Sequence, residues 1–185
     1  MLSTRSITRY YFRMHRTVTR VHPDGTPIEE IDILVAHTAP GILHRAFSVF
    51  VFSPDRTKLM LQKRFQGKPT FGGLWGNTCC SHQYEGESDT AAGERRLMEE
   101  MGFTVKLIQG ASFVYQANDP RGNGMAEHEH DTILMGTASE NTVVKLNPKE
   151  AEDWMWMTVA DLKMNLSIHP EKYVPWLPIA LKHIA

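Results

Sequence analysis

Runs of apolar residues, some continuous and some alternating with polar residues, predict a chain dominated by β-strands. Two such runs near residue 50 are separated by the turn-forming residues "SPDRT", which predicts a short hairpin. Closer to the N-terminus, "PDG" interrupts an extended stretch and predicts an earlier pair of strands. Strands are therefore expected in "VTRV", "TPIEEI", "RAFSVFVF", "KLMLQKR", "FTVKLIQGASFVYQ", "DTILMGTA" and "WMWMTV".

Helical signals are fewer. Ser88 can cap a helix that runs to Met101, and Gly102 suits the left-handed residue that ends one. Shorter helices are expected in "DLKMN" and "YVPWLPIALKHIA", the second beginning near Pro175. Residues 65–87 are rich in glycine and are expected to form a loop. Together these elements predict a mixed α/β (α+β) fold.

Composition sets limits on the function. A chain of 185 residues with 42% hydrophobic and 22% charged residues is typical of one globular domain. A net charge of −1 does not favour nucleic acid or an anionic membrane as a partner. Apolar runs stay below the roughly 18 residues of a membrane span. Cys79 and Cys80 are neighbours, which argues against a disulfide framework and indicates a reducing compartment such as the cytoplasm.

The N-terminal residues are basic and contain no acid before Asp24. Helical spacing would align their arginines on one face, as in an organellar transit peptide. The alternative is a solvated basic arm. We therefore divide the chain into residues 1–17, a basic arm or targeting segment, and residues 18–185, a single domain. The expected location is cytoplasmic, or an organelle if residues 1–22 are a transit peptide.

Two carboxylates near the end of the predicted helix are placed unfavourably. Glu99 and Glu100 face the negative end of the helix dipole, and an arginine four residues earlier is the poorer orientation for an ion pair. A divalent cation would make such carboxylates useful, because hard oxygen ligands suit Mg²⁺ bridged to phosphate.

The spacing around this helix resembles the Nudix box, G-x5-E-x7-R-E-U-x-E-E-x-G-U, where U is apolar. From Ser81 to Phe103 the chain follows S-x5-E-x7-R-R-L-x-E-E-x-G-F. Ser81 replaces the glycine, and Arg96 replaces the first glutamate of R-E-U. The acids of the box activate a water molecule in ordinary Nudix hydrolysis. The spacing therefore predicts the Nudix fold, and the loss of that glutamate argues for a chemistry other than hydrolysis.

A second set of residues is suited to a metal. His37 and His44 flank a Pro-Gly pair, so a loop can turn both toward one point, and His82 follows the cysteines. Strand alternation places Glu127 and Glu129 on one face and their neighbouring histidines on the other, without deciding which face is buried. Imidazole with carboxylate suits Zn²⁺, Mn²⁺ or Fe²⁺.

Together these features resemble the type 1 isopentenyl-diphosphate isomerases, from about Val18 to the C-terminus. The resemblance is carried by the variant box and by "AHTAPGILHRAFS", "WGNTCCSH", "YQANDPRGNGMAEHEH" and "YVPWLP". It implies a Nudix fold, a mixed β-sheet sandwiched between helices. It also implies an isomerase of isoprenoid biosynthesis, which interconverts isopentenyl and dimethylallyl diphosphate through a tertiary carbocation.

The resemblance also implies roles for individual residues. The metal ligands of a His3Glu2 site for Zn or Mn would be His37, His44, His82, Glu127 and Glu129. Glu100 would help to hold Mg²⁺ on the substrate diphosphate, which Arg64, Lys68 and Arg96 would contact. The catalytic residues would be Cys80, Glu129, Tyr115 and Trp176.

One departure concerns the diphosphate. The family usually has a lysine shortly before the first metal histidine, where this chain has Ile33. Either binding is weaker or another cation substitutes, with Arg20 and Arg45 as candidates. The expected partner is a small isoprenyl diphosphate, with no nucleic acid and no membrane span, bound by a monomer or weak dimer.

Three other functions remain as alternatives. A Nudix hydrolase of a diphosphate substrate would release phosphate or a monophosphate and would not need Cys80. A hydrolase with Cys80 as its nucleophile would pair it with a histidine. A binding module with a structural zinc would unfold on chelation and show no turnover.

Overall fold

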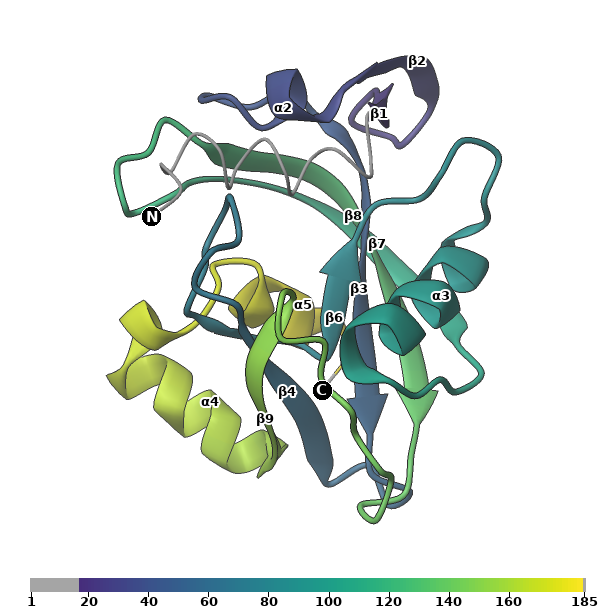
Figure 1. Cartoon of the computed structure of the whole chain (residues 1–185), viewed down its shortest axis with the longest axis vertical. Helices are drawn as coiled ribbons and strands as arrows, with labels where there is room; N and C mark the ends of the chain where they lie inside the picture. The colour runs from purple at the N-terminus through teal and green to yellow at the C-terminus, as the bar shows by residue number, and fades with distance from the viewer. Residues whose placement is uncertain (1–16, 185) are drawn as a thin grey trace.

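In the computed structural model, which describes residues 17–184, strand β3 (His44–Phe52) lies at the centre of a mixed nine-stranded sheet. It runs parallel to β8 and antiparallel to β1 and β6, and β7 and β2 extend the sheet beyond β8 and β1 (Figure 1). These neighbours are β1 (Thr17–Val21), β2 (Pro27–Asp32), β6 (Cys79–Ser81), β7 (Ile108–Asn118) and β8 (Ala126–Thr137).

The predicted hairpin opens immediately after its turn. β3 and β4 (Lys58–Arg64) pair at Phe52 and Leu59, and β4 then pairs along its length with β9 (Ala151–Thr158). Two short strands fill the opening, β5 (Trp75–Gly76) against β4 and β6 against β3. The expectation of a loop throughout residues 65–87 was therefore wrong at β5 and β6. Backbone pairing of Cys80 with Ser48 holds the cysteine in a defined direction.

Helices cover both faces of the sheet, as predicted (Figure 1). On β3, Phe47 and Val49 pack in one hydrophobic cluster with Leu97 of α3 (Asp89–Met101). The alternate residue Phe50 packs on the opposite side with Leu177 of α5 (Leu177–Ile184), and Leu162 of α4 (Val159–Ile168) belongs to the same cluster. The near-continuous apolar run of β3 is thus explained by burial on both of its faces.

Element boundaries agree with the sequence in some places and shift in others. The Ser88 hydroxyl accepts a hydrogen bond from Ala91 N at 3.3 Å, and Gly102 ends α3 with a φ of 73°. β7 begins later than "FTVKL" suggested, and "EHEH" lies inside β8 instead of preceding it. Two short helices were not predicted, α2 (Ile33–Ala36) and the 3-10 turn Pro170–Lys172.

The proposed arm or targeting segment lies almost entirely outside the described residues, which begin at Thr17. From residue 17 to residue 184, no helix is both long and apolar enough to cross a membrane.

Candidate active site

A cavity of about 160 Å³ opens where β4, β6, β7 and β8 meet. Ten of the twelve residues predicted from the sequence line it, and the remaining two, His44 and Glu100, are fully buried behind its wall. The lining residues that were not predicted as site residues are Ile33, Pro69, Thr70, Ser81, Tyr84, Glu99 and Glu150.

The three predicted histidines converge on Glu129 at one end of the cavity. We call these four residues the histidine cluster: one ligand atom from each of His37, His44, His82 and Glu129 lies within 4.8 Å of the others. His44 Nε2 and His82 Nε2 are 3.0 Å apart, and His82 Nε2 is 3.1 Å from Glu129 Oε1. Glu127 joins the cluster through His37, since its Oε2 is 2.9 Å from His37 Nε2. β8 therefore turns Glu127 and Glu129 inward.

Hydrogen bonds behind the rings leave lone pairs directed into the cluster. Nδ1 of His37 is 2.8 Å from the carbonyl oxygen of Ile33, and Nδ1 of His44 is 2.7 Å from that of Ile42. A carbonyl oxygen only accepts, so each neutral ring has its proton on Nδ1 and a lone pair on Nε2. Lone pairs on Nε2 and on carboxylate oxygens repel each other unless a cation or a proton lies between them. Imidazole nitrogens and carboxylate oxygens arranged in this way fit a divalent metal.

Without a metal, a proton takes that place. Burial disfavours the charged form of His37, but the facing carboxylates of Glu127 and Glu129 outweigh it and raise the pKa of His37 to about 9. Burial lowers the pKa of His82 to about 3. Burial also opposes ionisation of Glu129, but its interactions with His44 and His82 hold its pKa well below the ordinary value. The metal-free cluster thus combines a protonated His37, a neutral His82 and an ionised Glu129.

A thiol and two aromatic rings line the cavity beside Glu129. The Tyr115 hydroxyl donates to Glu129 Oε2 at 2.6 Å, and the Tyr115 and Trp176 ring centroids are 5.6 Å apart. Trp176 is 2% exposed, and its indole nitrogen donates to Asn77 Oδ1 at 2.9 Å. This hydrogen bond satisfies the polar edge of the indole, so the ring is held as part of the wall.

Cys80 keeps its proton in this environment. Burial raises the pKa of the Cys80 thiol to about 12, although Arg64 and Lys68 lower it in part. Arg64 Nη1 lies 3.2 Å from Cys80 Sγ. Cys79 is fully buried on the other face of β6, in the cluster beneath α3. Neither cysteine forms a disulfide. Because side chains alternate along a strand, Cys80 faces the cavity while Cys79 faces the cluster beneath α3.

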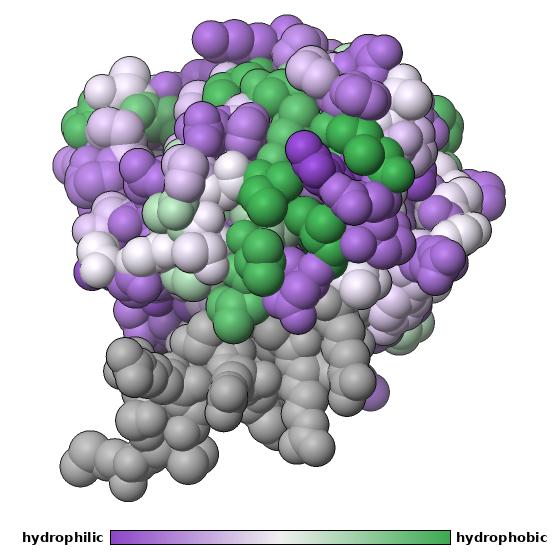
Figure 2. Space-filling model, turned by 90° about the horizontal axis from the view of Figure 1, so that it is seen from above, coloured by the Kyte–Doolittle hydropathy of each residue, from purple (hydrophilic) through white to green (hydrophobic). Residues whose placement is uncertain are grey.

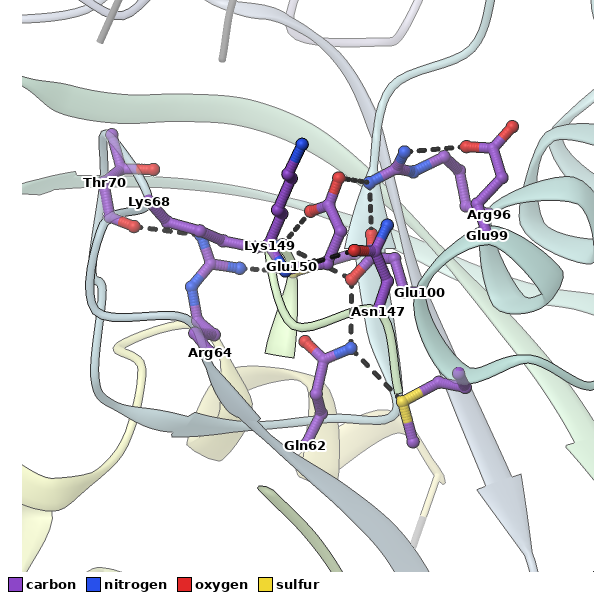
Figure 3. Close-up of polar contacts among 12 residues, drawn as sticks. Gln62, Arg64, Lys68, Thr70, Arg96, Glu99, Glu100, Asn147, Lys149 and Glu150 are labelled. Atoms are coloured by element: carbon purple, nitrogen blue, oxygen red, sulfur yellow. Dashed lines mark hydrogen bonds and ion pairs between the residues drawn. The ribbon is translucent and has the colours of Figure 1, made fainter. Parts of the chain in front are cut away.

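A second polar group lies farther along the cavity, and we call Arg64, Lys68 and Arg96 the cation cluster. Figure 3 shows Lys68 and Arg96 converging on Glu100. Glu100 accepts from Arg96 Nη2 at 2.6 Å and lies 3.3 Å from Lys68 Nζ, while Gln62 Nε2 donates to it at 3.0 Å. Burial opposes ionisation of Glu100, but Lys68 and Arg96 hold its pKa below the ordinary value. The i,i+4 pair of Arg96 and Glu100 is therefore a buried element of the pocket wall.

Sequence reasoning missed two residues that organise these groups. Thr70 donates from its hydroxyl to Glu127 Oε1 at 2.5 Å, and its carbonyl oxygen accepts from Arg64 Nη2 at 3.0 Å. Glu150 contacts both Lys68 and Arg96. Thr70 lies in a glycine-rich loop and Glu150 in a turn before β9, where no periodic pattern marks a residue as inward-facing.

The position of the missing lysine is apolar. Ile33 is 5% exposed and forms part of the cavity wall at the start of α2. Figure 2 shows hydrophobic side chains gathered on this end of the molecule, where Ile28, Leu34 and Val35 are exposed. Arg20 and Arg45 do not replace the lysine in the described structure. They pair with Glu29 and Asp89 respectively, and neither lines the cavity.

Comparison with known proteins identifies relatives along most of the chain. Residues 42–177 match the model of the NUDIX domain. The chain is 44% identical to isopentenyl-diphosphate Delta-isomerase 2 of Aromatoleum aromaticum, over 78% of this chain and 74% of that protein. It is 40% identical to the isopentenyl-diphosphate Delta-isomerase of Halorhodospira halophila, over 86% of this chain and 89% of the relative. Isopentenyl-diphosphate Delta-isomerase 1 of A. aromaticum is also 40% identical, over 92% of this chain and 93% of that protein.

Solved structures agree on the fold. A protein from Deinococcus radiodurans superposes with a TM-score of 0.69 at 14% identity, over 91% of this chain and 99% of that one. A MutT NUDIX hydrolase from Burkholderia pseudomallei superposes with a TM-score of 0.59 at 19% identity, over 77% of this chain and 98% of that one. At such identities the likeness is evidence for the architecture alone.

Proposed function

Because the chain belongs to the Nudix family and, within it, to the isopentenyl-diphosphate Delta-isomerases, we propose that its cavity interconverts isopentenyl diphosphate and dimethylallyl diphosphate. One observation carries this proposal. A protonated thiol, a tyrosine–glutamate pair and a cation cluster line the same cavity, so an alkene and a diphosphate of one small molecule can be held together.

The reaction moves a double bond by adding a proton at one carbon and removing a proton from another. Cys80 and Glu129 are the proposed proton-transfer groups, because both line the cavity and one is a thiol while the other is a carboxylate. Tyr115 orients Glu129 through its hydroxyl. The buried face of Trp176 offers π electrons to the tertiary carbocation, a contact worth about 2 kcal/mol or more in a desolvated site.

The histidine cluster and Glu127 are the proposed ligands of one divalent metal, zinc or manganese, in a His3Glu2 site. When bound there, the ion supplies a positive charge that fixes Glu129 and tunes its proton affinity. The protein's own contribution is the second layer of hydrogen bonds: the carbonyls of Ile33 and Ile42 orient two imidazoles, and Thr70 orients Glu127.

Arg64, Lys68 and Arg96 are the proposed diphosphate contacts, and Glu100 would help to hold a Mg²⁺ ion that would supply positive charge to the diphosphate. Carboxylate oxygens are donors that Mg²⁺ accepts. Arg96 stands where the Nudix box has a glutamate, so the carboxylate that this glutamate would offer to activate water is missing. The guanidinium of Arg96 instead binds the carboxylate of Glu100. This supports isomerisation over hydrolysis. The expected protein is a cytoplasmic monomer or weak dimer.

The test is proton NMR of isopentenyl diphosphate with the purified protein and Mg²⁺ in D₂O. We expect dimethylallyl diphosphate, with deuterium entering the new methyl group as the substrate is protonated. Release of phosphate or a monophosphate without a shift of the double bond would favour the hydrolase, and an unchanged substrate would also contradict the proposal.

A further inference from the structure

Glu150 lies beside two cations of the cation cluster in the wall of the cavity. Its Oε2 is 3.1 Å from Lys68 Nζ and its Oε1 is 3.2 Å from Arg96 Nη2. Its side chain is 15% exposed and lines the cavity, whereas that of Glu100, which contacts the same two cations, is 0% exposed. Figure 3 shows the carboxylates of both glutamates converging on Lys68 and Arg96. An anion that binds to Lys68 and Arg96 from the cavity therefore comes close to the Glu150 carboxylate.

The cation cluster is matched in charge by the carboxylates that Arg96 contacts. The cation cluster carries three positive charges, and Arg96 alone contacts three carboxylates, those of Glu99, Glu100 and Glu150. The formal charges of these six residues cancel. A diphosphate that binds to such a cluster gains less attraction than it would from unpaired cations, and it is repelled by nearby carboxylates. Binding of the anion therefore requires added positive charge or removal of a carboxylate.

The cluster nevertheless has an unsatisfied donor. Arg96 is 8% exposed, and its Nε has no hydrogen-bond partner among residues 17–184. A buried N–H without an acceptor is destabilising, and such a group is satisfied by an acceptor from water or from a ligand. Since Arg96 lines the cavity, a phosphate oxygen can be that acceptor.

We propose that Glu150 makes the binding of the substrate's diphosphate depend on a divalent cation. With no Mg²⁺ present, the Glu150 carboxylate retains Lys68 and Arg96 and repels the diphosphate. A diphosphate that arrives with Mg²⁺ carries the charge that offsets Glu150 and Glu100. This inference rests on the proposed function, because it concerns the same cavity and the same diphosphate class. Glu150 acts on the cations that hold the substrate and is a positioning residue.

The test is calorimetric titration of inorganic pyrophosphate into the purified full-length protein, with and without Mg²⁺. For the unchanged protein we expect Mg²⁺ to tighten binding by about tenfold or more, a coupling of ordinary size. In Glu150→Gln, a substitution of the same shape, Mg²⁺-free binding should tighten by about tenfold and the ratio between the two conditions should fall by a similar factor, to the part that Glu100 still contributes.

Two variants serve as controls. Glu140→Gln removes one negative charge at an exposed ion pair with Lys58, so it should leave the Mg²⁺ ratio unchanged and exclude a general effect of net charge. Glu150→Asp keeps the carboxylate and should keep most of the Mg²⁺ dependence. It also provides the comparison if thermal melting shows that Glu150→Gln does not fold.

Two results would overturn the inference: an unchanged ratio in Glu150→Gln, or binding weakened equally in both conditions, which indicates a structural role alone. The NMR assay separates this inference from the proposed function. If the protein isomerises its substrate but Glu150→Gln does not change the ratio of pyrophosphate affinities with and without Mg²⁺, only the inference is contradicted. If Glu150→Gln changes that ratio but the protein does not isomerise its substrate, only the proposed function is contradicted.

Discussion

At the scale of single residues, Thr70 joins the two polar halves of the cavity. Its hydroxyl donates to Glu127 beside the histidine cluster, and its carbonyl oxygen accepts from Arg64 in the cation cluster, a contact visible in Figure 3. A hydroxyl behind a metal-binding carboxylate fixes the direction of its lone pairs. One loop residue therefore orients both a proposed metal ligand and a proposed diphosphate contact.

Replacing Thr70 tests this coupling. Thr70→Val removes the hydroxyl at nearly constant volume and should weaken binding of the metal by about 10- to 100-fold, the usual cost of losing such a partner. Competition against a chromogenic chelator measures that affinity. Thr70→Ser retains a hydroxyl and should bind metal nearly as the unchanged protein does. Equal metal affinity in Thr70→Val and Thr70→Ser would show that the hydrogen bond to Glu127 does not matter.

The adjacent cysteines offer a matched pair of substitutions. Cys80→Ala removes the proposed proton-transfer thiol and should lower kcat by about 10²- to 10⁴-fold. Cys79→Ala makes the same change on the other face of β6, under α3, and should lower the melting temperature while leaving kcat nearly unchanged. The NMR assay in D₂O compares the two rates. A similar loss of kcat in both variants would attribute the effect to packing.

At the scale of elements, the turn between β7 and β8 clamps the loop that carries Lys68 and Thr70. Arg121 donates to the carbonyl oxygens of Lys68 and Pro69 at 3.0 and 2.8 Å. Asp119 accepts from Phe71 N at 2.6 Å, where Phe71 has a φ of 49° that residues with a side chain seldom adopt. The turn thus holds the loop in a conformation that it would not adopt alone.

Asp119→Asn should loosen this clamp. Burial raises the pKa of Asp119, but hydrogen bonds from Arg121 and Phe71 outweigh it and hold the pKa below its ordinary value. Its ionised form therefore stabilises the fold above the unfolded-state pKa, near 4, and this contribution is lost as pH falls through the folded-state pKa. At neutral pH we expect Asp119→Asn to cost about 1.5–3 kcal/mol, the usual range for hydrogen bonds to a charged group.

Urea unfolding at several pH values measures this effect. The difference between the unchanged protein and Asp119→Asn should shrink as the pH falls below about 4, because the unchanged protein then loses the same charge. A difference that stays constant with pH would mean that the Asp119 charge contributes nothing to the clamp.

At the scale of the whole molecule, the histidine cluster connects segments distant in sequence. His37 caps α2, His44 begins β3, His82 follows β6 and Glu129 lies within β8. An ion bound by all four would cross-link both sides of the central strand. Because such an ion binds the folded state and not the unfolded chain, it stabilises the fold in proportion to the logarithm of its concentration.

Removal of the metal tests this role. Dialysis against a chelator should lower the melting temperature and abolish turnover, and Zn²⁺ or Mn²⁺ should restore both. Mg²⁺ alone should not, since imidazole nitrogens suit the transition metals. If added metals restore the melting temperature but none of them restores turnover, the result would support the alternative of a binding module with a structural metal. Full activity in a protein shown by elemental analysis to be metal-free would contradict the proposed site.

Local pattern in the sequence was sufficient for several features. Ser88 and Gly102 delimit α3 because their side-chain and backbone preferences act within one turn of the helix. Strand alternation placed Glu127 and Glu129 on one face because the period of a strand is two. The spacing of the variant box and the segments around His37, His44 and His82 carried the resemblance to the isomerase family, which the NUDIX match and the relatives confirm.

Tertiary structure decided what depends on residues far apart in the chain. The pairing of β3 with β8 and β6, not the alternation, turned Glu129 inward and opened the predicted hairpin. Thr70 and Glu150 joined the site through contacts with residues 57 and 82 positions away, which no local periodicity records. The sequence by itself determined which chemical groups are present and how each segment folds. The pairing of β3 with β6 and β8 determined which of these groups meet in one cavity.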